Sequence, residues 1–414
     1  MRIVIVGAGI GGLSAALTLH RAGFDCVVHE RSEQVRELGV GFNMLPHAVK
    51  ELAALGLLDR LDEVGIRTHE LCYAHRLGPV ILRRPCGLDA GFSLPQFSLH
   101  RGRLQAVLLR AVLERLGPDA VRLGRRLVGF EQDTAGVRAD FVDRAGRPVD
   151  SARGDVLVAA DGIHSTVRSQ LFPAEGAPRW NGVMLWRGAT DWPVFGTGRS
   201  AVIAGGNAAK FVVYPIAAGA TPDTRLTNWA LCVQTGRDGD PPPQRQEWSR
   251  RADPAGLVPH LGRFHLPLLD HAALVTSTEE CFEFPMCDRD PLPYWTQRRV
   301  TLLGDAAHPM YPMGSNGAGQ AIIDAARLAD HLSRHTDPVD ALRAYQDDRL
   351  PATREVVLRN RTGGPERVID EVERLAPDGF SRVEDVIDPA ALDAIVGGYA
   401  RAAGASREQV NRIR

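Results

Sequence analysis

MRIVIVGAGIGG, residues 1–12, opens the chain with an apolar run that glycines follow at once. Consecutive apolar residues from 3 to 6 are typical of a strand buried in a parallel sheet. Apolar residues then recur at helical spacing over residues 10–17, and a second strand-like run covers residues 26–30. This order of strand, glycine turn, helix and strand predicts a βαβ unit at the start of an α/β fold.

The glycine turn fits the pattern G-x-G-x-x-G through Gly7, Gly9 and Gly12. Such a turn brings backbone N–H groups and the positive end of a helix onto a pyrophosphate, and a Cβ would block that approach. Glu30 ends the second strand 23 residues after Gly7, where a carboxylate can accept hydrogen bonds from both ribose hydroxyls. The pattern predicts a dinucleotide site, and by itself leaves FAD and NAD as alternatives.

The composition narrows the classes of protein. The chain has 414 residues, of which 44% are hydrophobic and 24% charged, which suits a globular protein of two or three domains at roughly 100–200 residues each. The 49 basic and 50 acidic residues balance to a net charge of -1, so we expect no nucleic-acid partner. No apolar run approaches the ~18 residues of a membrane span, and we expect a cytoplasmic protein without a membrane partner.

The six cysteines include no C-x-x-C pair, so they are interpreted as buried thiols in a reducing compartment rather than as a disulfide framework. The sequence also shows no cluster of metal ligands, and we expect no metal.

Two more turns follow predicted strands far downstream. One holds Asp161 and Gly162; the other holds Gly304 and Asp305 and leads through Pro312 into a second glycine-rich loop, residues 314–319. With the N-terminal turn, these motifs span residues 7 to about 320, and in this order they resemble the class A flavoprotein aromatic hydroxylases, the p-hydroxybenzoate hydroxylase-like family. Shorter segments are similar to the 5-methylphenazine-1-carboxylate 1-monooxygenase group, which replaces a ring carboxylate with a hydroxyl: residues 38–43, 100–102, 185–188, 288–293 and 310–314.

The resemblance and the strand pattern predict an α/β fold with a discontinuous, Rossmann-like FAD-binding domain, an inserted antiparallel β-sheet substrate domain and a helical C-terminal part. Short strand-like runs separated by Gly, Pro and Asn turns between residues 180 and 284 indicate the inserted sheet. The predicted FAD-binding domain comprises residues 1–70, 98–178 and 285–350. The predicted substrate domain comprises residues 71–97 and 179–284, and residues 351–414 form the C-terminal helical segment.

The resemblance also implies the residues that hold FAD. Asp305 would bind the ribityl chain, and Arg101 would lie near the cofactor. The helix that follows residues 314–319 can stabilise negative charge near the flavin pyrimidine ring. The full predicted set is Gly7, Gly9, Gly12, Glu30, Arg31, Gly41, Arg101, Asp161, Gly162, Gly304, Asp305, Gly314, Asn316 and Gly317.

The implied activity is a monooxygenase that consumes NAD(P)H and O2 and hydroxylates an aromatic small molecule through a flavin C4a-hydroperoxide, with or without loss of a ring carboxylate. Only one G-x-G-x-x-G is present, so NAD(P)H is expected in a shared groove beside Asp161 and Gly162. A monomer and a homodimer both remain open. The alternatives are a flavin-binding protein without turnover and a flavin-dependent halogenase or epoxidase, although the W-x-W-x-I-P segment of halogenases does not occur.

The predicted catalytic residues are Pro312, Lys210 and Tyr214, the last two on one face of a strand that ends at Pro215. Some related hydroxylases have a histidine four residues before this tyrosine, positioned to take the substrate's phenolic proton. Lys210 occupies that place, and three interpretations stay open: a cation that pairs with the substrate, a base with a lowered pKa, and a solvated rim residue.

The predicted substrate-binding residues are Met184, Trp186, Lys210 and Tyr214. For Trp186 and Tyr214, a place in the core is as plausible as substrate contact. Met184 shares the face of Trp186, so that face looks apolar, and Arg187 would point to the opposite face. His164 and His308 are interpreted as holding their turns. The charges of residues 366–373 are interpreted as a solvated helix face.

Overall fold

The parallel sheet carries the N-terminal βαβ unit. The computed structural model describes residues 1–35, 40–247 and 250–412, so Leu38 and Gly39 of the segment 38–43 lie outside the described residues. The sheet has the strand order β19-β20-β12-β1-β2-β8. Its strands are β1 (Arg2–Val6), β2 (Asp25–His29), β8 (Val121–Arg122), β12 (Val156–Ala159), β19 (Thr296–Gln297) and β20 (Val300–Leu302).

The parallel strands bring three turns together. β1 pairs in parallel with β2 and β12, and β12 pairs in parallel with β20. Because the carboxyl ends of parallel strands meet at one edge of a sheet, the turns that follow β1, β12 and β20 lie side by side. These are the three turns that carry the sequence motifs.

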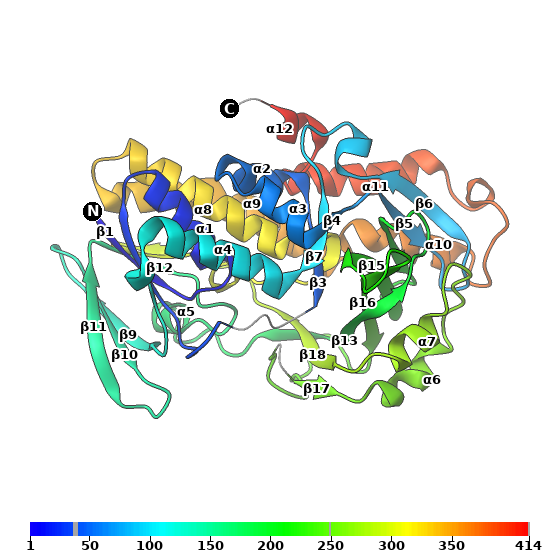
Figure 1. Cartoon of the computed structure of the whole chain (residues 1–414), viewed down its shortest axis with the longest axis horizontal. Coiled ribbons are helices and arrows are strands. Elements are labelled where there is room, and N and C mark those ends of the chain that lie inside the picture. The colour runs from blue at the N-terminus through cyan, green and yellow to red at the C-terminus, as the bar shows by residue number, and fades with distance from the viewer. Residues whose placement is uncertain (36–39, 248–249, 413–414) are drawn as a thin grey trace.

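Helices cover one face of this sheet. Figure 1 shows α1, α4 and α8 lying next to one another, and α1 contacts both α4 and α8. The other face carries a small antiparallel sheet with the order β11-β10-β9. The bounds of these elements are α1 (Ile10–Arg21), α2 (Pro46–Ala54), α3 (Leu58–Val64), α4 (Arg101–Leu116), α8 (Gly317–Arg334), α9 (Pro338–Arg361), β9 (Arg126–Gln132), β10 (Val137–Val142) and β11 (Pro148–Gly154).

A large sheet lies at the other end of the molecule (Figure 1). Its strand order is β17-β18-β13-β16-β15-β14-β5-β6, and β14 with β5 is its one parallel pair among the described strands. The bounds are β5 (Glu70–Ala74), β6 (Val80–Pro85), β13 (Arg179–Pro193), β14 (Ser200–Ala204), β15 (Ala209–Ala218), β16 (Thr224–Gln234), β17 (Arg251–Ala252) and β18 (Cys281–Asp288).

One strand end was predicted wrongly. Pro215 does not end its strand, because β15 continues to Ala218 with a bulge between Pro215 and Ala217. A bulge leaves a residue out of the ladder, so a strand can accommodate a proline, which has no N–H to donate.

The two faces of the large sheet pack against different elements. One face carries α6 (Val258–Leu261) and α7 (His271–Thr276) over a core that includes Phe211 and Trp229. The opposite face packs against Tyr311 and Met313, close to the third turn. A three-stranded sheet also contacts β15: β3 (Gly41–Met44), β7 (Phe97–His100) and β4 (Gly65–Arg67).

The C-terminal segment is helical and packs onto the large sheet. Its helices are α10 (Arg367–Leu375), α11 (Pro389–Ala402) and α12 (Arg407–Asn411). Val368, Ile369 and Val372 are buried against Tyr73 and Ile203 of the sheet. The exact division of the chain into domains stays a prediction. No helix within the described ranges is long and apolar enough to span a membrane.

His29 makes the stability of this fold depend on pH. It is buried in β2, stacks on Phe141 with ring centroids 4.4 Å apart, and its Nδ1 has no hydrogen-bond partner. Burial, aided by the nearby arginines, lowers the pKa of His29 to about 3. Below its ordinary pKa of about 6.5 the unfolded chain therefore binds a proton that the folded protein excludes, so this contribution to stability is lost as the pH falls.

We expect the free energy of unfolding to drop by about 2 kcal/mol between pH 7.5 and pH 5 through this histidine alone. Urea unfolding of the wild type and of His29→Phe, which cannot titrate, would measure the contribution as the difference between the two pH dependences. Parallel pH dependences in the two proteins would contradict the assignment to His29.

Candidate active site

The first turn contains glycines of two kinds. A Cβ on Gly7 would lie 2.4 Å from the Ala160 carbonyl oxygen, and a Cβ on Gly12 would lie 1.9 Å from the Gly7 oxygen. These two glycines are required by the packing of the turn itself. A Cβ on Gly9 would meet no atom within 4 Å, and Gly9 caps α1 without a side-chain hydrogen bond. The space beside Gly9, at the positive end of a helix, suits a pyrophosphate.

Glu30 lies beside this turn. Its Oε2 accepts a hydrogen bond of 2.8 Å from the Ala8 N–H, and its Oε1 accepts one of 2.8 Å from the Ser32 N–H. These two bonds fix the carboxylate next to the end of β1. Arg31 is exposed and lies near enough to His164 to contribute to lowering the pKa of that histidine, after the larger effect of burial.

The second turn contains a buried acceptor. Asp161 Oδ2 accepts a 2.8 Å hydrogen bond from the Thr166 N–H, whereas its Oδ1 is buried with no partner. Burial raises the pKa of Asp161. Gly162 has a φ of +82°, and a Cβ there would meet no atom within 4 Å. His164 Nε2 lies 3.1 Å from the Gln246 carbonyl oxygen, so this histidine ties the turn to a distant segment.

The third turn faces the start of α4. Asp305 is half-buried. Burial lowers the pKa of Arg101, and the negative charge of Asp305 counteracts that shift. A Cβ on Gly317 would lie 4.0 Å from Asp305 Oδ1, so the loop before α8 also approaches the carboxylate. The structure therefore brings Arg101, Asp305 and Gly317 together, as the resemblance implies.

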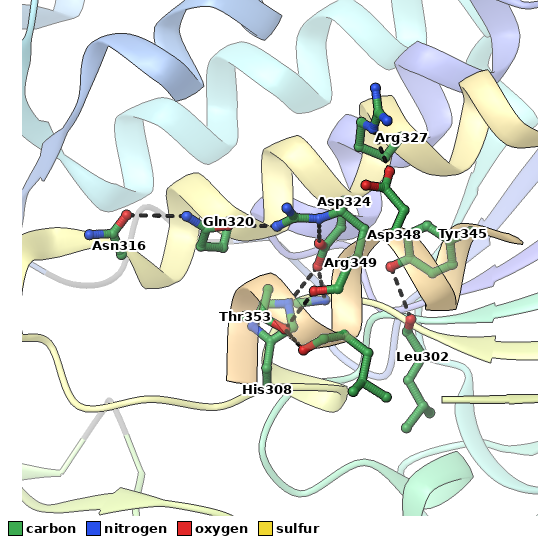
Figure 2. Close-up of polar contacts among 12 residues, drawn as sticks. Leu302, His308, Asn316, Gln320, Asp324, Arg327, Tyr345, Asp348, Arg349 and Thr353 are labelled. Atoms are coloured by element: carbon green, nitrogen blue, oxygen red, sulfur yellow. Dashed lines mark hydrogen bonds and ion pairs between the residues drawn. The ribbon is translucent and has the colours of Figure 1, made fainter. Parts of the chain in front are cut away.

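A buried polar network supports this turn from behind, and Figure 2 shows its members. Asp324 on α8 is 0% exposed; its Oδ2 lies 2.6 Å from His308 Nε2 and accepts a 3.1 Å hydrogen bond from the Gly304 N–H. Its Oδ1 accepts a 2.7 Å bond from Arg349 Nε. Burial alone would raise the pKa of Asp324, but His308 and Arg349 lower it to about 2.

The same network reaches the loop before α8. Arg349 Nη2 donates a 2.6 Å bond to Gln320 Oε1, and Gln320 Nε2 donates a 3.3 Å bond to Asn316 Oδ1. Sequence reasoning missed Asp324, Gln320 and Arg349. A usable signal was present, because Gln320 and Asp324 fall four residues apart within the apolar stripe of α8, and polar residues in such a stripe need partners.

The loop after Pro312 is held by the C-terminal segment. Pro312 is exposed. Gly314 has a φ of +66°, and a Cβ there would lie 2.5 Å from the Tyr399 ring. The Tyr399 hydroxyl accepts a 3.1 Å bond from Asn316 Nδ2, and the Gly314 N–H donates a 3.2 Å bond to Glu366 Oε1. Neither Glu366 nor Tyr399 was predicted, and Glu366 is 7% exposed rather than solvated.

Lys210 proves to be a paired, buried cation. It is 5% exposed and forms an ion pair with Glu366. Burial lowers the pKa of Lys210, but the carboxylate of Glu366 outweighs this effect and the net shift is upward. Lys210 is therefore neither a rim residue nor a base with a lowered pKa. It lines a cavity of about 160 Å³ together with Val183, Cys232, Met286, Tyr311 and Met313.

Tyr214 and Gly41 meet at Arg187. Tyr214 is 5% exposed, and burial raises its pKa to about 12 while Arg187 opposes that shift. Arg187 Nη2 donates a hydrogen bond to the Gly41 carbonyl oxygen, and the Gly41 N–H donates a 2.8 Å bond to Asn228 Oδ1. A Cβ on Gly41 would lie 2.5 Å from Ile216, so the close approach of β3 to the large sheet requires glycine.

Met184 and Trp186 lie on the other face of the large sheet. Trp186 Nε1 donates a 3.1 Å bond to Glu283 and the ring stacks on His260, while Met184 packs against Trp180. They share a face, as predicted, but it is opposite to the one that packs on Tyr311 and Met313. Because side chains alternate along a strand, we withdraw both residues as substrate contacts.

Lys210→Met would leave the Glu366 carboxylate buried without its cation. We expect a loss of about 2–3 kcal/mol in the free energy of unfolding. The loss is smaller than for a carboxylate that stays charged, because Glu366 can take up a proton and become neutral. The double variant with Glu366→Gln should recover most of the loss. Urea unfolding measures the stability of both variants. The control is Arg359→Met, which removes an exposed ion pair with Glu355 and should lower the free energy of unfolding by less than about 1 kcal/mol. A double variant less stable than Lys210→Met would contradict the pairing.

Comparisons with known proteins agree on one family. The model described as "FAD binding domain" matches residues 1–360. The chain is 42% identical over 369 residues to a phenazine 1,6-dicarboxylic acid hydroxylase of Lysobacter antibioticus, covering 87% of this chain and 89% of the relative. It is 32% identical over 370 residues to 3-hydroxybenzoate 6-hydroxylase 1 of Aquipseudomonas alcaligenes, covering 87% of each.

A solved structure is similar over almost the whole chain. It is a variant of HpxO from Klebsiella pneumoniae complexed with FAD, 25% identical, with a TM-score of 0.76 and coverage of 98% of this chain and 99% of that chain. The α/β architecture inferred from the sequence is thus confirmed.

Proposed function

Because the chain belongs to the FAD-binding-domain family and is an FAD-dependent aromatic monooxygenase, we propose that it uses NAD(P)H and O2 to hydroxylate a carboxylated, phenazine-like aromatic small molecule. One observation carries the proposal. The three motif turns meet at one sheet edge, and the loop that follows the third turn packs on the large sheet beside a cavity. Cofactor and substrate would therefore be held next to each other.

The residues at the sheet edge fit FAD. The space beside Gly9 at the start of α1 would receive the pyrophosphate, and Glu30 would accept hydrogen bonds from the ribose. Asp305 and Arg101 would hold the ribityl chain and its surroundings. Gly304, Gly314, Asn316 and Gly317 would shape the backbone that meets the ring system, with the N-terminus of α8 favouring negative charge there. When bound, FAD takes up a hydride from NAD(P)H and activates O2.

The NAD(P)H site is proposed beside the second turn. Asp161 Oδ1 is a buried acceptor without a partner, and Gly162 leaves space next to it. Arg31 lies on the same side, close to His164. These groups would hold NAD(P)H during hydride transfer without a second glycine turn of the first kind.

The substrate would lie on the face of the large sheet that packs on Tyr311 and Met313. Val183, Cys232 and Met286 give the cavity apolar surface that suits a planar ring, and Arg179, Asp238 and Arg361 add charged groups to its lining. Pro312 would contribute backbone at the junction with the cofactor. Tyr214, with its raised pKa, stays protonated near neutral pH and would orient the substrate by hydrogen bonding rather than act as a base.

Lys210 is proposed to have a structural role in the cavity. Lys210 lines the cavity, but its charge is neutralised by Glu366, so we assign it to shaping the pocket. The proposed ring carboxylate is supported by the relative that is 42% identical and is named for phenazine 1,6-dicarboxylic acid.

The test is substrate-stimulated turnover. The purified protein would be incubated with phenazine 1,6-dicarboxylate, phenazine-1-carboxylate or 3-hydroxybenzoate, with NADH or NADPH, in air. We expect faster NAD(P)H oxidation with at least one of them and a product that gains one oxygen or exchanges CO2 for a hydroxyl, read by mass spectrometry. Flavin-bound protein that oxidises NAD(P)H with none of them would contradict the proposal.

A further inference from the structure

Arg187 is a cation on the pocket side of the large sheet. It pairs in register with Ala230 of β16, which pairs with Val212 of β15. Ala230 and Val212 belong to the cluster that packs on Tyr311 and Met313, so Arg187 lies on the face of the large sheet that the loop after Pro312 covers. Two residues earlier on β13, Leu185 lies on the same face.

Arg187 differs from the other buried cations in the partners that the described residues give it. Among the described residues, no Asp or Glu forms an ion pair with Arg187, although other buried cations have such partners: Lys210 pairs with Glu366, Arg349 with Asp324 and Arg168 with Glu175. Burial lowers the pKa of Arg187, Tyr214 opposes this shift, and the nearby cation Arg101 adds to it. A half-buried charge without a counter-ion is costly.

Two hydrogen-bond donors on this face find no acceptor among the residues that the structure describes. They are Nε of Arg187 and Nδ2 of Asn228, and both atoms are buried. The Asn228 amide is oriented by the bond that its Oδ1 accepts from Gly41, so its NH2 group must be a donor. Asn228 pairs in register with Tyr214, whose hydroxyl lies beside Arg187. A cation beside a second hydrogen-bond donor fits an anion that has only acceptor atoms. An ionised carboxylate is such an anion.

We propose that Arg187, assisted by Asn228, selects substrates that carry a ring carboxylate by pairing with that anion. The inference rests on the proposed function and makes Arg187 its specificity-determining residue. It also moves the role of substrate counter-ion from Lys210, which Glu366 already neutralises, to Arg187, which has no such carboxylate among the described residues. Alternatively, Arg187 could pair with the negative charge of the reduced cofactor. A measurement of the flavin reduction potential would detect that role.

The test compares charged and neutral probes of one shape. Phenazine-1-carboxylate and phenazine-1-carboxamide, and 3-hydroxybenzoate and 3-hydroxybenzamide, would be titrated into the FAD-loaded protein while the flavin absorbance is followed. We expect the wild type to bind a carboxylate at least about tenfold more tightly than its amide. Arg187→Gln should weaken carboxylate binding by about 10- to 100-fold and leave amide binding within about twofold. Arg187→Lys should recover part of the preference.

The control is Arg251→Gln, which removes an exposed arginine of β17 in the same sheet and should behave as the wild type. A wild type that prefers neither carboxylate over its amide overturns the proposal, and so does an Arg187→Gln variant that loses both probes equally. If Arg187→Gln changes the flavin reduction potential but keeps the preference for carboxylate over amide, Arg187 acts on the cofactor instead. That result would also overturn the proposal. Turnover of amides as fast as carboxylates sinks this inference alone, whereas absence of aromatic turnover sinks the proposed function.

Discussion

Gly9→Ala is expected to yield a folded protein that has lost FAD, whereas Gly12→Ala is expected not to fold. Both changes add one methyl group to the same turn. At Gly9 the backbone is extended, with φ -73° and ψ -179°, and the new Cβ enters open space. That space is where the pyrophosphate would approach the start of α1, so the methyl group would displace the ligand and not the fold. We expect at least a 100-fold loss of FAD affinity, about 2.7 kcal/mol.

At Gly12 the new Cβ would lie 1.9 Å from the Gly7 carbonyl oxygen, a backbone atom that cannot move without opening the turn. We expect a loss in the free energy of unfolding of more than about 5 kcal/mol, which is enough to unfold a domain of ordinary stability. Circular dichroism and urea unfolding report folding, and flavin absorbance after gel filtration reports FAD content. Normal FAD content in Gly9→Ala would remove Gly9 from the cofactor contact. Wild-type stability in Gly12→Ala would contradict the turn geometry.

Asp324→Ala is expected to destabilise the protein by about 4–5 kcal/mol. The change leaves three buried groups without their partner: the Arg349 guanidinium, the His308 Nε2 and the Gly304 N–H. Breaking a buried ion pair costs about 3–5 kcal/mol because the remaining charge stays desolvated, and the orphaned N–H adds about 1 kcal/mol or more. FAD affinity should fall as well, because the Gly304 bond positions the turn that carries Asp305.

Asp348→Ala is the matched control, since Asp348 lies on α9 beside the same network (Figure 2) and pairs with Arg327 at 2.6 Å. Its side chain is 31% exposed, so we expect a cost under about 1 kcal/mol and normal FAD binding. Urea unfolding with and without added FAD measures both variants. Equal stability of Asp324→Ala and Asp348→Ala would show that burial does not set the energetics of this network.

The first turn and its flanking elements could be predicted because their signals lie within short segments of the sequence. The strand, glycine turn, helix and strand of residues 1–30 follow from periods of two and 3.6 residues and from the steric needs of glycine. The parallel order of β1, β12 and β20 then brings their three turns to one edge, whatever the intervening chain does. Gly9 and Glu30 were proposed as cofactor contacts from this local pattern, whereas Asp161 and Asp305 were proposed from the resemblance of the turns that carry them.

The pocket could not be predicted in the same way. Lys210 stood out in the sequence as one of two lysines, yet its partner Glu366 is 156 residues away, on a segment whose charges suggested a solvated helix face. The alternation of side chains along β13 places Trp186 and Arg187 on opposite faces of the sheet. It does not determine which of the two faces is the pocket side. That choice depends on whether α7 or the loop at Tyr311 covers each face of the sheet.

The sequence by itself determined the class of fold, the dinucleotide turn and the family, because each depends on the order of residues within short segments. Only the tertiary structure decided which charges are neutralised. Within the part of the chain that the structure describes, Lys210 pairs with a carboxylate and Arg187 does not. The tertiary structure also decided which elements support the turns through Asp324, Glu366 and Tyr399. The physical reason is that the energy of a buried charge or donor depends on the groups within a few ångströms of it. Here those groups come from elements that are far apart along the chain.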